Sequence, residues 1–403
     1  MSTVGVLTFL VQYDQNFVYG SVGTQPEGSL GCQVTAEKSQ RESLEVVREV
    51  SEGASLSSRG VSYAAREPRD GELRLHTWGL LRLNQEQVVL IVVAGLVVLF
   101  GAMLPGFLTL GNLLTLLRNV SVLGILSLAM GLVVIARGLD LSLVATMGVS
   151  TALTLQELGD PGTSVLQAIL TGLGVCIAMG LLNGFVIAFV EIPALFTTLA
   201  TGLAVFGVAR TFFLSGGNLI VEVPERGAFI RAMGLGHVLE VPVPVLIFAA
   251  ACMGMHFVLT RACLGRFIYA HGDNPEAAAL TGIPTRPLTM IEYTFCALLG
   301  YLAGLVLAGT LNAMDTQVIM TSPLIYNVLT VVVLGGISLV GGRGGVLSVV
   351  AGTLLIGVML NGMTLLNMDV FVQQIIQGLI LLAALVLDKR LNPRDEETVK
   401  QGD

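Results

Sequence analysis

The strongest constraint on this chain is a series of apolar runs, each close to the roughly 20 residues that a helix needs to cross a bilayer. Only 12% of the residues are charged and 54% are hydrophobic, whereas soluble domains carry about 25% charged residues. These runs predict an all-α fold, a polytopic transmembrane helical bundle of about ten spans. We place the spans at residues 87–105, 114–136, 140–157, 164–190, 194–214, 242–260, 288–310, 323–340, 345–366 and 370–387.

Two features of the predicted spans are unusual. The span 164–190 is longer than a straight crossing needs, so we expect it to tilt or to break near Gly180–Gly184. The spans 114–136 and 140–157 are separated only by the segment Arg137–Asp140. Two interpretations of that segment stay open: a full turn between two crossings, or a break within a re-entrant pair.

The two ends of the chain differ from its apolar middle. Residues 1–85 are polar and show no sustained periodicity, which indicates a disordered extension or a misassigned start. Residues 86–388 form the predicted transmembrane domain, and residues 389–403 form a polar tail that we expect in the cytoplasm.

The distribution of basic residues orients the predicted bundle, because cytoplasmic loops carry an excess of Lys and Arg. With ten spans both termini lie on one side, and we expect that side to be the cytoplasm and the loop 215–241 to lie outside. The basic residues on the cytoplasmic side are Arg66, Arg69, Arg74, Arg82, Arg261, Arg266, Arg286, Arg343, Lys389, Arg390, Arg394 and Lys400, and those opposite are Arg118, Arg226 and Arg231.

Several function classes lack their sequence signatures. The chain has no GxxxxGK(S/T) loop, so we expect it to bind no ATP through a P-loop of its own. HExxH and GxSxG are absent, and the 5 cysteines form no CxxC. The net charge of −7 says nothing about nucleic-acid binding, but the chain has no basic stripe that would favour it. We therefore expect no enzyme activity, no bound cofactor and no metal site.

The segment between the spans 242–260 and 288–310 carries the clearest local signal. Asp273 or Asn274 can cap a helix that has Pro275 in its first turn. Glu276–Leu280 is a run of strong helix formers, and Gly282 can end it. We predict a helix of about two turns at Asp273–Leu280. Its alanines at 277, 278 and 279 suit insertion into a groove on another protein.

This segment resembles a known family. Residues Gly265–Gly282, GRFIYAHGDNPEAAALTG, are similar to the coupling loop of sugar-type ABC importer permeases, the ribose-permease group with its branched-chain-permease-like members. Three further pieces match in order: GLDLS at Gly138–Ser142, Asn183–Gly202 and Val331–Gly362. The resemblance assigns ATPase coupling to Gly265, Arg266, Gly272, Asp273, Asn274, Pro275, Glu276, Ala277, Ala278 and Gly282.

The resemblance implies a permease for a monosaccharide or a similar small polyol in the bacterial inner membrane. It also implies partners: a second permease copy or paralogue, a cytoplasmic ABC ATPase subunit that uses the ATP, and a periplasmic substrate-binding protein. This sequence departs from the family at two places. The family usually has Thr-Gly-Gly ahead of Ile-Asp-Leu-Ser, whereas this chain has Ala136, Arg137 and Gly138 followed by Leu139. The family also commonly has an acidic residue about where this chain has Tyr326 or Asn327.

Four residues are candidates for the translocation path. Asp140 is an internal pin or gate, or else it forms an ion pair with Arg137, and both interpretations stay open. Asn183 can hydrogen-bond across helices. Phe196 and Tyr326 can stack on a sugar ring, although aromatic residues in spans more often serve packing or anchoring.

Two other features have simple structural interpretations. The dense glycines at 335, 336, 341, 342 and 344 predict a tight turn between closely packed helices, because neither the strand nor the Lys-Ser/Thr of a phosphate loop is present. We expect Glu292, at the start of the span 288–310, to face the cytoplasm.

The main alternative function is a stand-alone secondary transporter of a small polar solute. Such proteins usually have inverted repeats and acidic or histidine relays within their spans. Here charges within the spans are sparse and no repeat is evident. A membrane-embedded enzyme has less support, because the 4 histidines are scattered along the chain.

Overall fold

The computed structural model describes residues 85–213, 220–316 and 323–391. All of them belong to one compact unit. The predicted extension at residues 1–85 therefore lies outside the described residues except for its last residue. The predicted tail at 389–403 lies outside them beyond residue 391, where the last helix ends.

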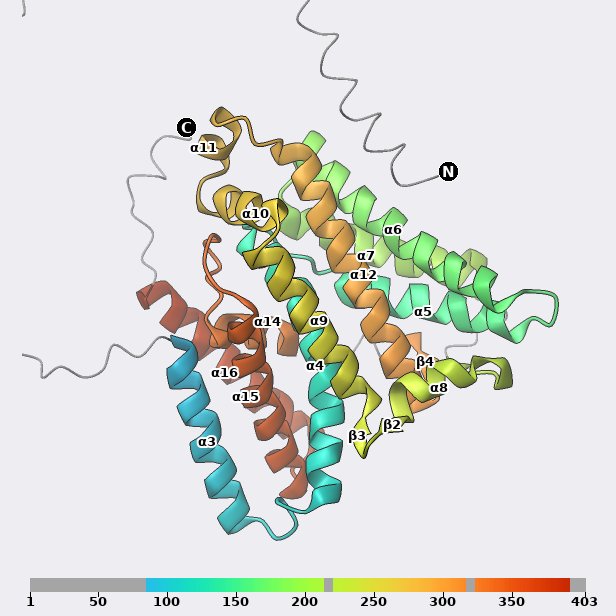
Figure 1. Ribbon diagram of the computed structural model, residues 1–403, viewed down its shortest axis with the longest axis vertical. Coiled ribbons are helices and arrows are strands. Elements are labelled where there is room, and N and C mark those ends of the chain that lie inside the picture. Colours follow the sequence, from blue (N-terminus) through green and yellow to red (C-terminus); the bar gives the residue numbers. More distant parts are fainter. Residues whose placement is uncertain (1–84, 214–219, 317–322, 392–403) are drawn as a thin grey trace, which may run out of the picture. The chain divides into compact units, whose positions relative to one another are not determined.

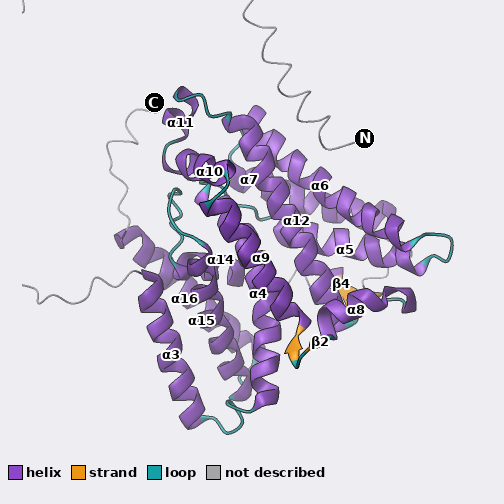
Figure 2. Cartoon of the chain, viewed as in Figure 1, coloured by secondary structure: helices purple, strands orange, loops and turns teal. Residues whose placement is uncertain are grey.

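Helices dominate the described part of the chain (Figure 1, Figure 2). Within it, 7 helices are long and apolar enough to cross a membrane, and each coincides closely with a predicted span. The polytopic helical bundle predicted from the apolar runs is confirmed. These helices are α3 (Gln85–Met103), α4 (Leu110–Ile135), α6 (Val165–Phe189), α7 (Ala194–Val208) with its extension η1 (Ala209–Phe213), α9 (Val243–Thr260), α12 (Thr285–Leu311) and α15 (Val346–Leu365).

Three further helices occupy the remaining predicted spans: α5 (Leu143–Gly159), α14 (Leu324–Gly335) and α16 (Val370–Leu391). The 12 residues of α14 reach about 18 Å, well short of the roughly 30 Å hydrocarbon core. The 17 residues of α5 reach about 25 Å, which is also short of a straight crossing. The segment Arg137–Asp140 is a non-helical connection between α4 and α5.

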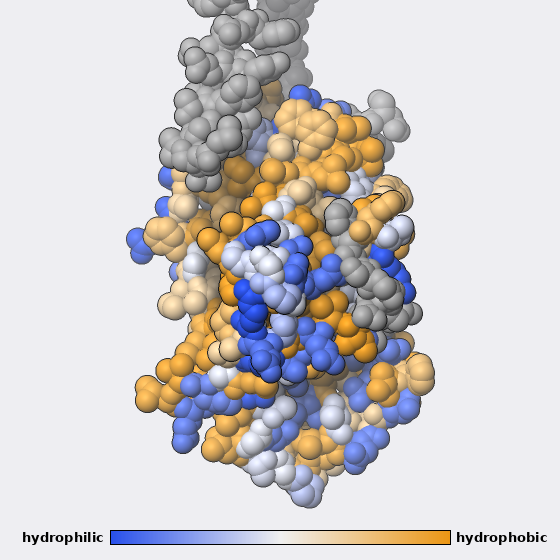
Figure 3. Space-filling view, turned by 90° about the vertical axis from the view of Figure 1, so that its right-hand side faces the viewer, coloured by the Kyte–Doolittle hydropathy of each residue, from blue (hydrophilic) through white to orange (hydrophobic). Residues whose placement is uncertain are grey.

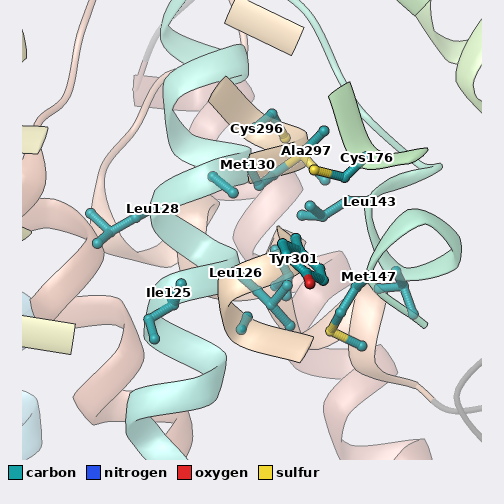
Figure 4. Packing of buried hydrophobic residues seen from close by; sticks show 14 of the residues in the cluster. Ile125, Leu126, Leu128, Met130, Leu143, Met147, Cys176, Cys296, Ala297 and Tyr301 are labelled. Atoms are coloured by element: carbon teal, nitrogen blue, oxygen red, sulfur yellow. The ribbon is translucent and has the colours of Figure 1, made fainter. Parts of the chain in front are cut away.

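The core lies where α4, α5 and α12 meet. Every residue of α4 from Val120 to Ile135 is buried, as expected for a helix that is apolar on all faces. Leu126 and Met130 of α4, Leu143 of α5 and Tyr301 of α12 belong to one cluster of buried side chains (Figure 4). A second, smaller cluster joins α3 to α15 and the first half of α4.

Glycines bring α6 into backbone contact with α12. A Cβ atom at Gly180 would lie 2.5 Å from the Cα atom of Thr294, and one at Gly184 would collide with Met290. α6 is one continuous helix over Val165–Phe189, so the break expected near Gly180–Gly184 is wrong. These glycines permit close helix packing, which is their common role in membrane bundles.

Small elements cap the end of the bundle at which α9 begins and α12 ends. The strands pair as two antiparallel two-stranded sheets, β1 with β4 and β2 with β3. Val221 faces Met314 in the first sheet, and Val238 faces Val241 in the second. The elements here are β1 (Ile220–Glu222), η3 (Glu225–Gly227), α8 (Ala228–Leu235), β2 (His237–Val238), β3 (Val241–Pro242) and β4 (Ala313–Asp315).

The predicted loop 215–241 is therefore structured wherever it is described. Within it, α8 packs on α12 through Gly234, where a Cβ atom would strike the backbone of Gly309. At the opposite end of the bundle, α10 (Cys263–Asp273) and α11 (Pro275–Leu280) connect α9 to α12 (Figure 1).

Large apolar side chains are exposed over much of the surface. The face in Figure 3 carries broad hydrophobic areas beside gathered hydrophilic ones. Phe371 on α16 is 73% exposed and Leu203 on α7 is 62% exposed. Exposure on this scale would be unfavourable in water, and it fits a surface covered by lipid or by another membrane subunit.

The contact between α6 and α12 leads to a stability prediction. Gly184→Ala forces the two helices apart, and overpacking of this kind costs about 1–3 kcal/mol. We expect a lower free energy of unfolding for the purified protein in mixed micelles, measured by SDS titration. Gly174→Ala is the matched control, because it lies on α6 with nothing within 4 Å of an added Cβ. Equal stability of the two variants would contradict the packing role of Gly184.

Candidate functional site

The predicted coupling segment contains two helices rather than one. Gly265, Arg266, Gly272 and Asp273 belong to α10, and α11 starts at Pro275. Asn274 between them is extended, with φ −149° and ψ 102°. A residue before proline is pushed out of the helical region, so Pro275 ends α10 as well as starting α11. The prediction that Asp273 begins the helix is wrong, because Asp273 is the last residue of α10.

Both ends of α11 have the local chemistry that the sequence indicates. The side chain of Asn274 accepts a hydrogen bond from the backbone N–H of Ala277 at 3.0 Å. At the other end Gly282 has φ +85°. Its N–H donates to the carbonyl of Ala279 at 3.0 Å, and the N–H of Ile283 donates to the carbonyl of Ala278 at 3.1 Å. This is the Schellman arrangement, which favours glycine at this position.

α11 presents a small apolar surface. Glu276, Ala277 and Ala279 are exposed, whereas Ala278 faces the protein. Leu280 is 90% exposed. An exposed leucine beside two alanines on a well-capped helix is suited to contact with another protein. Composition alone did not single out Leu280, because its exposure depends on which face of α11 packs inward.

The C-terminal end of α10 is held by backbone contacts. A Cβ atom at Gly272 would collide with the carbonyl oxygen of Ile135, the last residue of α4. The N–H of Gly342 donates to the same carbonyl at 2.8 Å. The hydroxyl of Tyr269 on α10 donates to the carbonyl of Gly344 at 2.7 Å. α10 is therefore fixed to the end of α4 and to the turn between α14 and α15.

That turn is the one predicted from the glycine-dense segment. Gly336, Gly341, Gly342 and Gly344 all have positive φ, from +69° to +117°. A Cβ atom at Gly341 would lie 2.6 Å from the carbonyl oxygen of Gly272. The density of glycines was the available signal that another backbone approaches here. The sequence did not show that this backbone belongs to α10.

Two titratable features at this end of the bundle have defined surroundings, His271 and one ion pair. Burial, and then the nearby Arg137, lower the pKa of His271 below the usual value of an imidazole. Arg286 pairs with Glu191 at 3.1 Å and lies 5.5 Å from the ring centroid of Phe189. Both charged side chains of this pair are mostly exposed, so it contributes at most about 1 kcal/mol.

A buried polar cluster joins α5, α6 and α7. The carboxylate of Asp140 accepts hydrogen bonds from the N–H and the hydroxyl of Ser142, at 2.9 and 2.5 Å. The amide of Asn183 donates to the Ser142 hydroxyl at 2.8 Å, and the hydroxyl of Thr201 donates to the Asn183 carbonyl oxygen at 2.6 Å. Asp140 is 2% exposed and Asn183 1%. The structure thus brings together two of the four predicted path residues.

The other path candidates lie elsewhere. Phe196 is 63% exposed and Tyr326 is 58% exposed, whereas the cluster is buried. The ion-pair interpretation of Asp140 is wrong, because Arg137 is exposed and its side chain is in no ion pair within the described ranges. Glu292 is 2% exposed and does not face the cytoplasm as expected. No cluster of side chains suited to a metal ion occurs in the described part of the chain.

Comparison with known proteins identifies the family. Residues 112–385 match the family described as branched-chain amino acid transport system / permease component. This chain belongs to that family. It is thus a membrane-embedded transporter subunit of the ABC importer class and not an enzyme. No solved structure matches the permease.

Three curated relatives of the permease are similar over most of their length. The ribose import permease protein RbsC of Escherichia coli (strain K12) is 30% identical over 305 residues, which are 76% of this chain and 94% of the relative. The fructose import permease protein FrcC of Rhizobium meliloti is 29% identical over 343 residues, which are 83% of this chain and 93% of the relative. The L-arabinose transport system permease protein AraH of Escherichia coli (strain K12) is 33% identical over 311 residues, which are 76% of this chain and 92% of the relative.

The docking of α10 leads to a second prediction. Gly272→Ala cannot keep α10 against α4, and we expect the free energy of local opening of α10 to fall by about 1–3 kcal/mol. Amide hydrogen exchange of residues 263–273 measures this change in the inserted protein. Gly95→Ala is the control, because an added Cβ there meets nothing within 4 Å. Unchanged exchange in α10 would show that Gly272 does not hold it.

Proposed function

We propose that the permease imports a monosaccharide or a similar small polyol, with energy from ATP hydrolysis on a separate ABC ATPase subunit. The ATPase docks on α11 at the cytoplasmic face, and a periplasmic substrate-binding protein delivers the sugar to the opposite face. The permease lies in the bacterial inner membrane, spans it several times with both termini in the cytoplasm, and pairs with a second copy or a paralogue.

The observation that carries this proposal is the way α11 is presented. α11 is capped at both ends and exposes Ala277, Ala279 and Leu280. It is joined directly to α12 and, through α10, to α9 and α4. A force applied to α11 by a partner reaches three membrane helices through packed elements, as transmission between distant parts of a protein requires.

The substrate class rests on the relatives. Their names assign ribose, fructose and L-arabinose to permeases that align with most of this chain. We place Asp140 and Asn183 beside the translocation path as an internal pin, because their buried hydrogen bonds join three helices. Phe196 and Tyr326 are exposed, so they contact substrate only if the path runs along a surface covered by the second subunit.

The stand-alone secondary transporter has no comparable support. It would use charged relays within its spans, and a coupling helix would have no partner. Glu292 and Asp140 are buried acidic residues, but Asp140 is already hydrogen-bonded to Ser142, and no histidine lies among the partners of either within the described residues.

A charge placed on α11 tests the docking claim. We expect Leu280→Glu to leave the permease inserted and to weaken binding of its cognate ATPase about tenfold or more, since buried apolar anchors dominate interfaces. Copurification of the ATPase from membranes measures this. Leu239→Glu is the control, because Leu239 is 94% exposed at the other end of the bundle. Full ATPase binding by an inserted Leu280→Glu permease would refute the docking site.

Reconstitution tests the energy source. Proteoliposomes that hold the permease, the ATPase and the binding protein should take up radiolabelled sugar only with ATP, and omission of any one component should stop uptake. The panel should include ribose, fructose and L-arabinose. Accumulation driven by an ion gradient in vesicles that contain the permease alone would establish the secondary transporter instead.

A further inference from the structure

An apolar cavity of about 230 Å³ lies between α9, α10 and α12, and it also touches α4. Glu292 is its only charged or hydrogen-bonding side chain, and all other lining residues are apolar or glycine. The lining residues are Leu132, Ala251, Gly254, Met255, Val258, Leu264, Ile268, Ile291, Glu292, Phe295 and Leu299.

Glu292 is an acidic residue in apolar surroundings. Its side chain is 2% exposed, and its buried Oε1 atom has no hydrogen-bond partner within the described residues. A buried carboxyl group without a partner costs several kcal/mol, and acidic residues within membrane spans are usually paired or functional. The structure therefore leaves a buried acceptor without a partner on a residue that lines an apolar cavity.

Water does not satisfy this acceptor well. A buried water molecule needs about two to four polar partners, and the cavity lining offers one carboxyl group. A sugar is excluded for the same reason, because most of its hydroxyl groups would stay unpaired. The lining suits a molecule that is apolar along its length and carries a single donor group at one end.

We propose that this cavity binds an amphiphilic amine, whose ammonium group pairs with Glu292 and whose alkyl chain fills the space toward Leu264 and Ile268. Charge complementarity favours an ammonium group over a hydroxyl group, because hydrogen bonds between charged partners are roughly twice as strong. The volume corresponds to about eight non-hydrogen atoms at about 30 Å³ each. This inference is independent of the sugar proposed above.

The bilayer provides the access route. Ile291 and Phe295 line the cavity and are 39% and 38% exposed, so part of the cavity lining reaches the surface of the bundle. Amphiphiles concentrate at the membrane surface, and Glu292 lies about two helical turns from the start of α12. Because Leu264 and Ile268 belong to α10, an occupant braces α10 against α12.

Calorimetric titration of the permease in lipid nanodiscs tests the proposal, with empty nanodiscs as the baseline. Heptylamine and 1-heptanol, which differ only in the head group, are the probes. We expect heptylamine to bind about ten- to hundredfold more tightly than 1-heptanol. Glu292→Gln should reduce amine binding to the level of the alcohol. Glu191→Gln is the control, because it removes an acidic group from the surface pair with Arg286.

A second pair of variants separates the cavity from the charge. Gly254 lines the cavity and an added Cβ atom there meets nothing within 4 Å, so Gly254→Leu should fill the cavity and abolish binding of both probes. Gly174→Leu makes the same change at an open position on α6 and should retain binding. Equal binding of the two probes, full amine binding by Glu292→Gln, or no binding above that of empty nanodiscs would each overturn the proposal.

Discussion

Direct contact between backbones at glycines is the interaction on which the rest of the permease depends. Gly180 and Gly184 set α6 against α12, and Gly234 sets α8 against the other end of α12. Gly272 does the same for α10. In lipid there is little hydrophobic driving force between helices, so close packing of backbones has to supply much of the stability. Adding a single methyl group at any of these glycines would break the contact.

The polar groups inside the bundle follow from the same constraint. Little water is available inside the bundle, so buried polar groups need hydrogen-bond partners within the protein. Asp140 and Asn183 both hydrogen-bond to the hydroxyl of Ser142, and Thr201 donates a further hydrogen bond to Asn183. This network fixes the non-helical segment between α4 and α5, where lipid-exposed backbone would not be tolerated. Glu292 differs from these residues, since its buried Oε1 atom has no partner within the described residues. That contrast makes the cavity beside it a candidate ligand site.

α10 connects the membrane core to the surface that we propose for the ATPase. It rests on the last carbonyl of α4 and on the turn between α14 and α15, through Gly272 and Tyr269. The junction between α10 and α11 is the extended residue Asn274, which also caps α11. Movement of α11 relative to the bundle would therefore have to change either this junction or the docking of α10.

The sequence alone determined the properties that depend on local chemistry. Apolar runs located the helical segments, because their length must match the bilayer. Asn274, Pro275 and Gly282 located α11, because caps and terminators act within a few residues. Only the tertiary structure decided what depends on distant partners. It made α6 continuous, divided the coupling segment at Asn274, exposed Leu280 and buried Glu292. Burial and backbone contact are set by which helices meet, and no local pattern encodes that choice.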